Sequence, residues 1–286
     1  MPWGICCSFR SGDIESDKNR GINHQLQETS FLKKFGFRLA ELTLKVRLRE
    51  IEKEVSRAAG CPVRLERFIR GRGWGVKYLG FPTGGDSPAW VVKAASGLIE
   101  FRLKQALKGA YIPAGERFSR ECRLLEELEK LALGPRVLLC TQGFFAREFV
   151  AGTPLTELSP GDLPAHVEPV LQAIERTVVE KVFHTDPNAT NVIVRADGGG
   201  YCLIDSEIPG EDDPEGELAS IRRVYCHERF LYSLSPVKIK LPSHVSSKAL
   251  SVAVNFFDRM GDDAPVPPAR VAALVSGNAT PVEFPG

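Results

Sequence analysis

The sequence predicts an α+β protein in which a sheet-rich part precedes a mainly helical part. Before residue 150, short runs of apolar and polar residues alternate with period two, as expected of half-buried strands. After that point apolar residues recur mainly at helical spacing, and a single hairpin signal interrupts them. Strands and helices are therefore expected to be segregated along the chain, which is typical of the α+β class.

Four segments of different composition follow one another. Residues 1–29 contain almost nothing to bury and are expected to form a flexible tail. Residues 30–60 are expected to form a helical extension, residues 61–150 the sheet-rich lobe, and residues 151–286 a reduced helical lobe. We expect the extension to pack on the sheet-rich lobe, near the helix that carries Glu121, because its apolar residues lie along one helical stripe.

The strands are predicted from alternation and from the turns that separate them. The glycine-rich stretch at residues 71–75 separates the first two runs, and residues 82–88 form a turn before the third run. The residues Ala196-Asp-Gly-Gly-Gly form a hairpin signal between the last two runs. The predicted strands are 63–69, 76–81, 90–94, 136–140, 144–150, 192–194 and 201–204.

The helices are predicted from leucine spacing and from stop signals. Gly60 ends the first helix, and Gly134-Pro135 ends the second. The predicted helices are 31–59, 117–133, 164–182, 215–231, 246–260 and 268–276.

Composition excludes several classes of protein. Hydrophobic residues make up 43% of the 286 residues and charged residues 26%, and the formal net charge is +1, so no global field attracts nucleic acid or an anionic membrane. Seven irregularly spaced cysteines with no CxxC pair indicate neither a zinc site nor a disulfide framework. We therefore expect reduced thiols in the cytoplasm or another reducing compartment, with delivery into a host cell left open. No apolar run is long enough for a transmembrane segment.

The sharpest motif runs from His184 to Asp205. Asp186 and Asn191 lie five residues apart in a loop between a predicted helix and a predicted strand, and Asp205 ends the second strand of the following hairpin. Phosphoryl transfer needs a carboxylate that orients the attacking hydroxyl, and hard oxygen ligands for Mg²⁺. Asp186 suits the first task, and Asn191 with Asp205 suits the second.

This run resembles the catalytic loop of protein kinases, H-x-D-x-x-x-x-N, and its later metal-binding Asp. The resemblance implies a two-lobed protein-kinase-like fold that uses ATP and Mg²⁺. It also implies that His184 has a structural role. Three departures are visible, because Thr185 replaces the usual Arg, Asn188 replaces a common Lys, and Ser206-Glu207 replaces Phe-Gly after the metal Asp.

The upstream landmarks of the family occur in the same order. Gly71, Gly73, Gly75 and Val76 resemble the glycine-rich loop, with the third glycine one residue early. Lys93, in Trp-Val-Val-Lys, resembles the strand lysine that holds the α- and β-phosphates.

The next two landmarks are a helix acid and a hinge. Glu121 is similar to the helix residue that pairs with the strand lysine, and Glu126 is the reserve candidate. The segment from Glu148 to Val150 resembles the hinge, whose backbone would face adenine. The resemblance covers residues 62–232 and favours a compact, atypical member, similar to bacterial effector kinases or lipopolysaccharide kinases.

Simpler interpretations of these residues exist. Asp186 and its neighbours are typical turn formers, and Lys93 could extend from a strand edge into solvent. Arg147 is expected at the surface. The leading function is a protein kinase acting on Ser, Thr or Tyr. A small-molecule, sugar or lipid kinase and a nucleotide-binding pseudokinase or scaffold remain alternatives, because the acceptor is not encoded in these motifs.

Overall fold

The computed structural model describes most of the chain beyond residue 46, and every feature below belongs to the compact unit Leu48–Gly286. Among the described residues, no helix has the length and apolar character needed to cross a membrane. The described residues are 47–68, 75–97, 100, 104, 111–184, 186–205, 218–235, 238–239 and 242–282.

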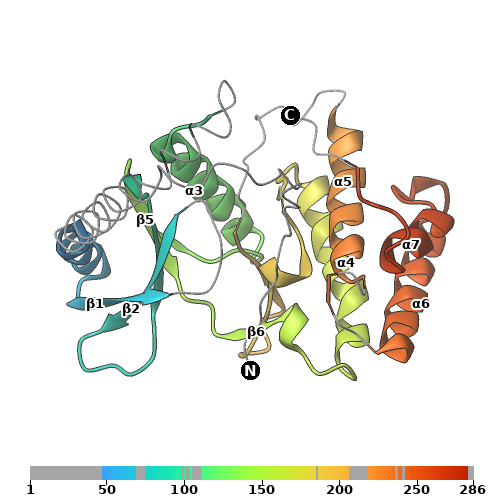
Figure 1. The fold of residues 1–286 in the computed structure, drawn as a ribbon, viewed down its shortest axis with the longest axis horizontal. Helices are drawn as coiled ribbons and strands as arrows, with labels where there is room; N and C mark the ends of the chain where they lie inside the picture. The colour runs from blue at the N-terminus through green and yellow to red at the C-terminus, as the bar shows by residue number, and fades with distance from the viewer. Residues whose placement is uncertain are drawn as a thin grey trace, which may run out of the picture. The chain divides into compact units, whose positions relative to one another are not determined.

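An antiparallel five-stranded sheet forms the first half of this unit (Figure 1). Its strand order is β1-β2-β3-β5-β4, and all neighbouring pairs are antiparallel. The strands are β1 (Val63–Phe68), β2 (Val76–Pro82), β3 (Trp90–Ala94), β4 (Val137–Cys140) and β5 (Phe144–Glu148).

The second half is mainly helical and contains a small antiparallel sheet of order β6-β7-β8. The predicted class, a sheet followed by helices, is therefore confirmed. The strands are β6 (Gly152–Pro154), β7 (Val192–Arg195) and β8 (Tyr201–Leu203), and the helices are α4 (Leu163–Val179), α5 (Leu218–Ser233), α6 (Ser243–Met260) and α7 (Pro268–Val275).

Helix α3 (Ala114–Lys130) links the two halves through one hydrophobic core. On α3, Phe118 makes an edge-to-face contact with Phe145 of β5, at 5.5 Å between ring centroids. Leu125 and Leu128, also on α3, are fully buried in the same cluster as the apolar faces of α4 and α5. The position of α3 relative to the sheet is therefore set by large buried side chains.

The helix over residues 48–59 covers the opposite face of the five-stranded sheet. Its Ile51 and Val55 are buried against Tyr78, Val92 and Ala146, which share one face because they are cross-strand partners. We expected this helix to pack on the sheet-rich lobe, and it does. The expected position near the Glu121 helix was wrong, because α3 packs on Phe145, whose side chain points to the other face of the sheet. Residues 31–46 of the predicted helix lie outside the described residues.

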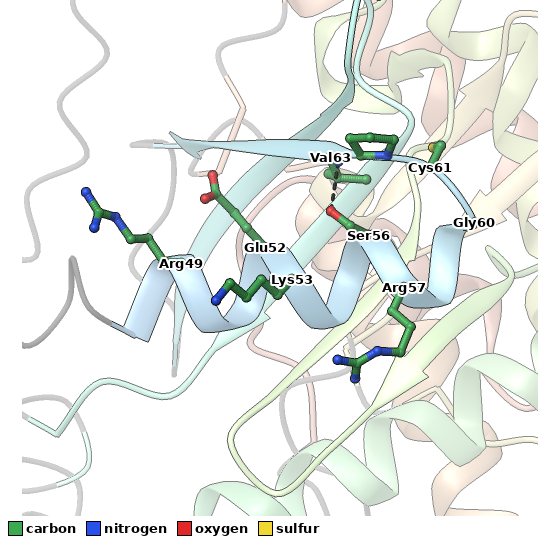
Figure 2. Close-up of a pocket in the computed structure, with 9 residues that line it drawn as sticks. Arg49, Glu52, Lys53, Ser56, Arg57, Gly60, Cys61 and Val63 are labelled. Atoms are coloured by element: carbon green, nitrogen blue, oxygen red, sulfur yellow. Dashed lines mark hydrogen bonds between the residues drawn. The ribbon is translucent and has the colours of Figure 1, made fainter.

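The same helix also satisfies the backbone of edge strand β1. The Val63 amide donates to Ser56 Oγ at 2.9 Å, and the Leu65 amide donates to Glu52 Oε1 at 2.9 Å. Figure 2 shows the first of these bonds between the helix and the start of the strand. Edge strands with unpaired amides are prone to pair with other chains, so this cover protects the sheet.

We predict that Ile51→Ala will lower the free energy of unfolding by about 2–5 kcal/mol, because it removes a side chain that is 4% exposed. Urea unfolding of the full chain measures the loss. Lys53→Ala, an exposed position on the same helix, is the control and should change stability by less than about 0.5 kcal/mol. Equal stability of the two variants would show that this helix does not stabilise the sheet.

Candidate functional site

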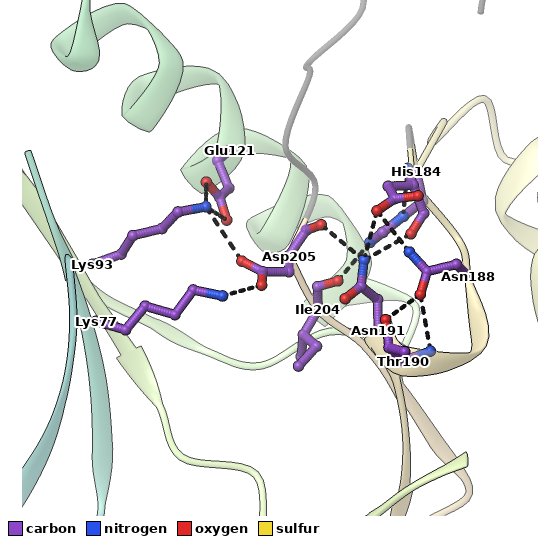
Figure 3. Close-up of polar contacts among 10 residues, drawn as sticks. Lys77, Lys93, Glu121, His184, Asn188, Thr190, Asn191, Ile204 and Asp205 are labelled. Carbon is purple, nitrogen blue, oxygen red and sulfur yellow. Dashed lines mark hydrogen bonds and ion pairs between the residues drawn. The ribbon is translucent and has the colours of Figure 1, made fainter. Parts of the chain in front are cut away.

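Lys93 and Glu121 form a buried ion pair between β3 and α3 (Figure 3). The Lys93 ammonium donates to Glu121 Oε2 at 2.9 Å and to Oε1 at 3.2 Å, and the two side chains are 4% and 5% exposed. Burial raises the pKa of Glu121, and the positive charge of Lys93 acts against this rise. Glu121, rather than Glu126, is therefore the helix acid at this lysine.

Asp205 lies at the end of the hairpin β7–β8 and faces two lysines. Its Oδ1 accepts a hydrogen bond from Lys93 at 3.2 Å, and its Oδ2 accepts one from Lys77 of β2. Burial opposes ionisation, but Lys93 and Lys77 outweigh burial and hold the pKa of Asp205 well below its usual range. The backbone of Asp205 has φ of 64°, a conformation that Asp tolerates better than most residues.

The loop before β7 holds Asp186 and Asn191 in contact with each other. The Asn191 amide nitrogen donates to the Asp186 carbonyl and to Asp186 Oδ2, both at 3.0 Å, and to the Asp205 carbonyl at 3.3 Å. Asn188 donates to the same Asp186 Oδ2 at 2.7 Å. Asn191 therefore joins the loop to the strand end that carries Asp205.

His184 has structural contacts. Its Nδ1 accepts the Asp186 amide at 3.2 Å, so its Nε2 carries the proton and donates to the Ile204 carbonyl at 3.2 Å. Burial lowers the pKa of His184, which keeps the imidazole neutral. A neutral His184 links the loop to the residue before Asp205.

The arginines of the site were not identified from the sequence. Arg229 of α5 donates through Nε to Asp186 Oδ1 at 2.9 Å. Arg147 was expected at the surface, and this was wrong: it is 8% exposed, and its Nη1 donates to the Glu148 carbonyl at 3.1 Å. Arg147 pairs with Val91 of β3, two residues from the Lys93–Phe145 pair, so its side chain lies on the same face of the sheet as Lys93.

The segments that are expected to bind nucleotide are only partly described. Gly71 and Gly73 lie outside the described residues, as do Thr185 and residues 206–217. Gly75 is described, and a Cβ there would lie 2.9 Å from the Ala94 carbonyl and 3.2 Å from Lys93 Cγ. A side chain at this position would therefore push β2 away from β3 beside Lys93.

Val76 does not share a face with Lys93. Val76 is paired with Ala94 and packs in the cluster under the helix over 48–59. Because side chains alternate along a strand, the β2 residue on the Lys93 face is Lys77, its register partner. The expectation that Val76 contacts the nucleotide is therefore corrected: its register places it on the face opposite Lys93.

The hinge candidates have defined backbone partners. The Glu148 amide donates to the Arg136 carbonyl at 2.8 Å, and the Phe149 amide donates to the Ala89 carbonyl at 2.8 Å. Val150 is 8% exposed and packs with Ile193. An adenine contact by the hinge backbone stays a prediction.

The oxygen donors fit a magnesium ion held jointly with phosphate. The Asn191 amide nitrogen is directed at two carbonyls, so its Oδ1 is directed away from them and available to a cation. No group of three His, Cys, Asp or Glu suited to a metal occurs among the described residues. One carboxylate and one amide oxygen suit Mg²⁺, which usually takes its other ligands from phosphates and water.

The fold and the site define one class of protein. An antiparallel sheet supplies a buried lysine, the next helix supplies its acid, and a following loop and strand end supply Asp186, Asn191 and Asp205. This arrangement resembles the protein-kinase-like fold that the sequence motifs led us to expect.

The solved structures that resemble this chain do so at low similarity. No protein-family model and no curated protein matches the chain. A crystal structure of a mutant PknI kinase domain from Mycobacterium tuberculosis has a TM-score of 0.39 and 16% identity, over 75% of this chain and 94% of that chain. The PknI kinase domain without that mutation has a TM-score of 0.35 and 16% identity, over 68% and 73% of the two chains.

Proposed function

We propose that this protein is a phosphotransferase that uses ATP and Mg²⁺, and specifically a small atypical protein kinase that modifies Ser, Thr or Tyr. One observation carries the proposal. An unbroken series of polar contacts runs from Glu121 through Lys93 and Asp205 to Asn191 and Asp186. These residues come from distant parts of the chain, and a plain turn at Asp186 would not require this convergence.

Lys93 is assigned to the α- and β-phosphates of ATP. Its ammonium is held at a defined position by Glu121, so little side-chain freedom is lost when it binds phosphate. The carboxylate of Asp205 and the amide oxygen of Asn191 are assigned to Mg²⁺. The ion, when bound, neutralises phosphate charge and aligns the phosphoryl group.

Asp186 is assigned to the acceptor hydroxyl. Asn188 and Asn191 fix its Oδ2, and Arg229 contacts its Oδ1. The Arg229 side chain is 38% exposed, so it is the contact that an incoming hydroxyl displaces most easily. Asp186 then orients that hydroxyl and accepts its proton.

The metal assignment is tested with Asp205→Asn. We predict that this variant binds ATP at least about tenfold more weakly than the wild type when Mg²⁺ is present, and no more weakly than the wild type when Mg²⁺ is chelated. Isothermal titration calorimetry measures both affinities. Asp197→Asn, in the exposed turn between β7 and β8, is the matched control and should bind as the wild type does. Equal magnesium dependence in wild type and Asp205→Asn would contradict the assignment.

Transfer itself is tested with ATP labelled at the γ-phosphate. The label should move to protein Ser, Thr or Tyr if the protein-kinase proposal holds. Label on sugars, lipids or other small molecules would replace it with the small-molecule alternative. Stabilisation by Mg²⁺ and ATP without any transfer would instead indicate a pseudokinase.

A further inference from the structure

Two lysines, not one, converge on Asp205. Lys77 and Lys93 are direct cross-strand partners in the antiparallel pair β2–β3, so their side chains leave the sheet on the same face. Lys93 donates to Asp205 Oδ1 and Lys77 donates to Oδ2. Figure 3 shows both side chains extending from the sheet toward this carboxylate.

Such a pair of like charges needs an anion between them. Like charges directly opposite on neighbouring strands destabilise a sheet. Glu121 neutralises Lys93, and Asp205 is the acidic partner that the described residues provide for Lys77. An anion must therefore stay near Lys77 whenever Asp205 is engaged elsewhere.

The side chains of the two lysines also differ in how firmly they are held. The Lys93 side chain is 4% exposed and is fixed by Glu121, whereas the Lys77 side chain is 19% exposed. If Asp205 coordinates a metal ion, as the proposed function requires, its oxygens cannot all remain paired with ammonium groups. Lys77 is then the cation that leaves, because Lys93 keeps its bond to Glu121.

We propose that Lys77 is a second phosphate-binding residue, which exchanges Asp205 for a phosphate oxygen when a nucleoside di- or triphosphate binds. This inference rests on the proposed function. The ammonium group suits the exchange, because it is a point charge with three rotatable donors on a flexible stem. Gly75, just before β2, has no side chain, which allows the β2 and β3 backbones to lie close together where Lys77 and Lys93 face each other.

The test compares Lys77→Met with the wild type in the full-length chain, using calorimetric affinities for ATP, ADP and adenosine with Mg²⁺ present. Loss of a charge-assisted hydrogen bond predicts about 10- to 100-fold weaker binding of ATP and ADP. Adenosine lacks phosphate, so its affinity should not change. Lys77→Arg keeps the charge and should restore most of the affinity. Lys130→Met, at an exposed position on α3, should bind all three ligands as the wild type does.

The outcomes separate this inference from the proposed function. If the wild type binds ATP and Lys77→Met binds it equally well, only the role of Lys77 is overturned. An equal loss for adenosine and ATP would also overturn it, because a purely structural role predicts that result. If the wild type binds neither ATP nor ADP, the proposed function fails and this inference fails with it. Lys77→Gln provides the same comparison should the methionine variant not fold.

Discussion

Replacing Asp186 with asparagine is expected to slow γ-phosphate transfer by about 10²- to 10⁴-fold, the usual contribution of a general base. The substitution keeps the shape of the side chain but removes the group that accepts the proton. Initial rates at saturating ATP and Mg²⁺ measure the effect. ATP affinity should stay within about threefold of the wild-type value, because the Asp186 carboxylate is bonded to Asn188, Asn191 and Arg229, whereas phosphate binding is assigned to Lys93.

The control for this prediction is Asp197→Asn, which changes an exposed aspartate in the same half of the chain. Its transfer rate should equal that of the wild type. If the transfer rate of the Asp186→Asn variant falls by less than tenfold, Asp186 is not the residue that accepts the proton. A large loss together with a lower unfolding temperature would indicate that the contacts with Asn188 and Arg229 mainly hold the loop in place.

The elements were predictable where local pattern and burial agree. The sequence predicts the hairpin at Val192–Leu203, because two strand-like runs flank a turn that contains three consecutive glycines. Strand β6 was missed, because Gly152-Thr-Pro has the composition of a turn and pairs only at a sheet edge, where proline is tolerated. Helix α3 begins at Ala114 rather than at 117, because Pro113 is extended and ends the preceding segment.

The site was predictable to the extent that its chemistry is local in sequence. Asp186 and Asn191 are neighbours along one loop, so their spacing alone indicated a shared role. The pairing of Lys77 with Lys93 could have been predicted from the sequence. Both residues are equally distant from Gly85, so a regular hairpin centred there places them opposite each other. The role of Arg229 could not be predicted from the sequence. Its contact with Asp186 depends on which face of α5 points toward a loop far upstream, and no local sequence pattern determines this.

The Lys93–Glu121 pair leads to the largest expected effect on stability. Lys93→Met leaves the Glu121 carboxylate buried without its partner, and breaking a buried ion pair in this way costs about 3–5 kcal/mol. We expect that loss in the free energy of unfolding at pH 8, measured by urea denaturation. The loss should be smaller at pH 5, because the buried carboxyl can then take up a proton.

The sign of this pH dependence follows from the pKa of Glu121. Burial already raises its folded pKa, and removal of Lys93 raises it further above the unfolded value of about 4.3. A carboxyl with a raised folded pKa favours folding below the unfolded pKa, and this advantage is lost as pH rises through the folded pKa. The folded pKa of Asp205 is depressed, so the stability that Asp205 contributes to the folded state is lost only as pH falls below about 4. That contribution is constant between pH 5 and pH 8, so it does not affect the comparison of these two pH values.

The double variant Lys93→Met, Glu121→Gln is the control that isolates the buried charge. It removes both charges, so most of the stability lost at pH 8 should return, and the difference between pH 5 and pH 8 should disappear. If Lys93→Met loses the same stability at pH 5 and at pH 8, the prediction is wrong. The loss would then come from the packing of the lysine side chain between β3 and α3, and not from its charge. A double variant as unstable as the single one would lead to the same conclusion, because the uncompensated carboxylate would then not be the source of the loss.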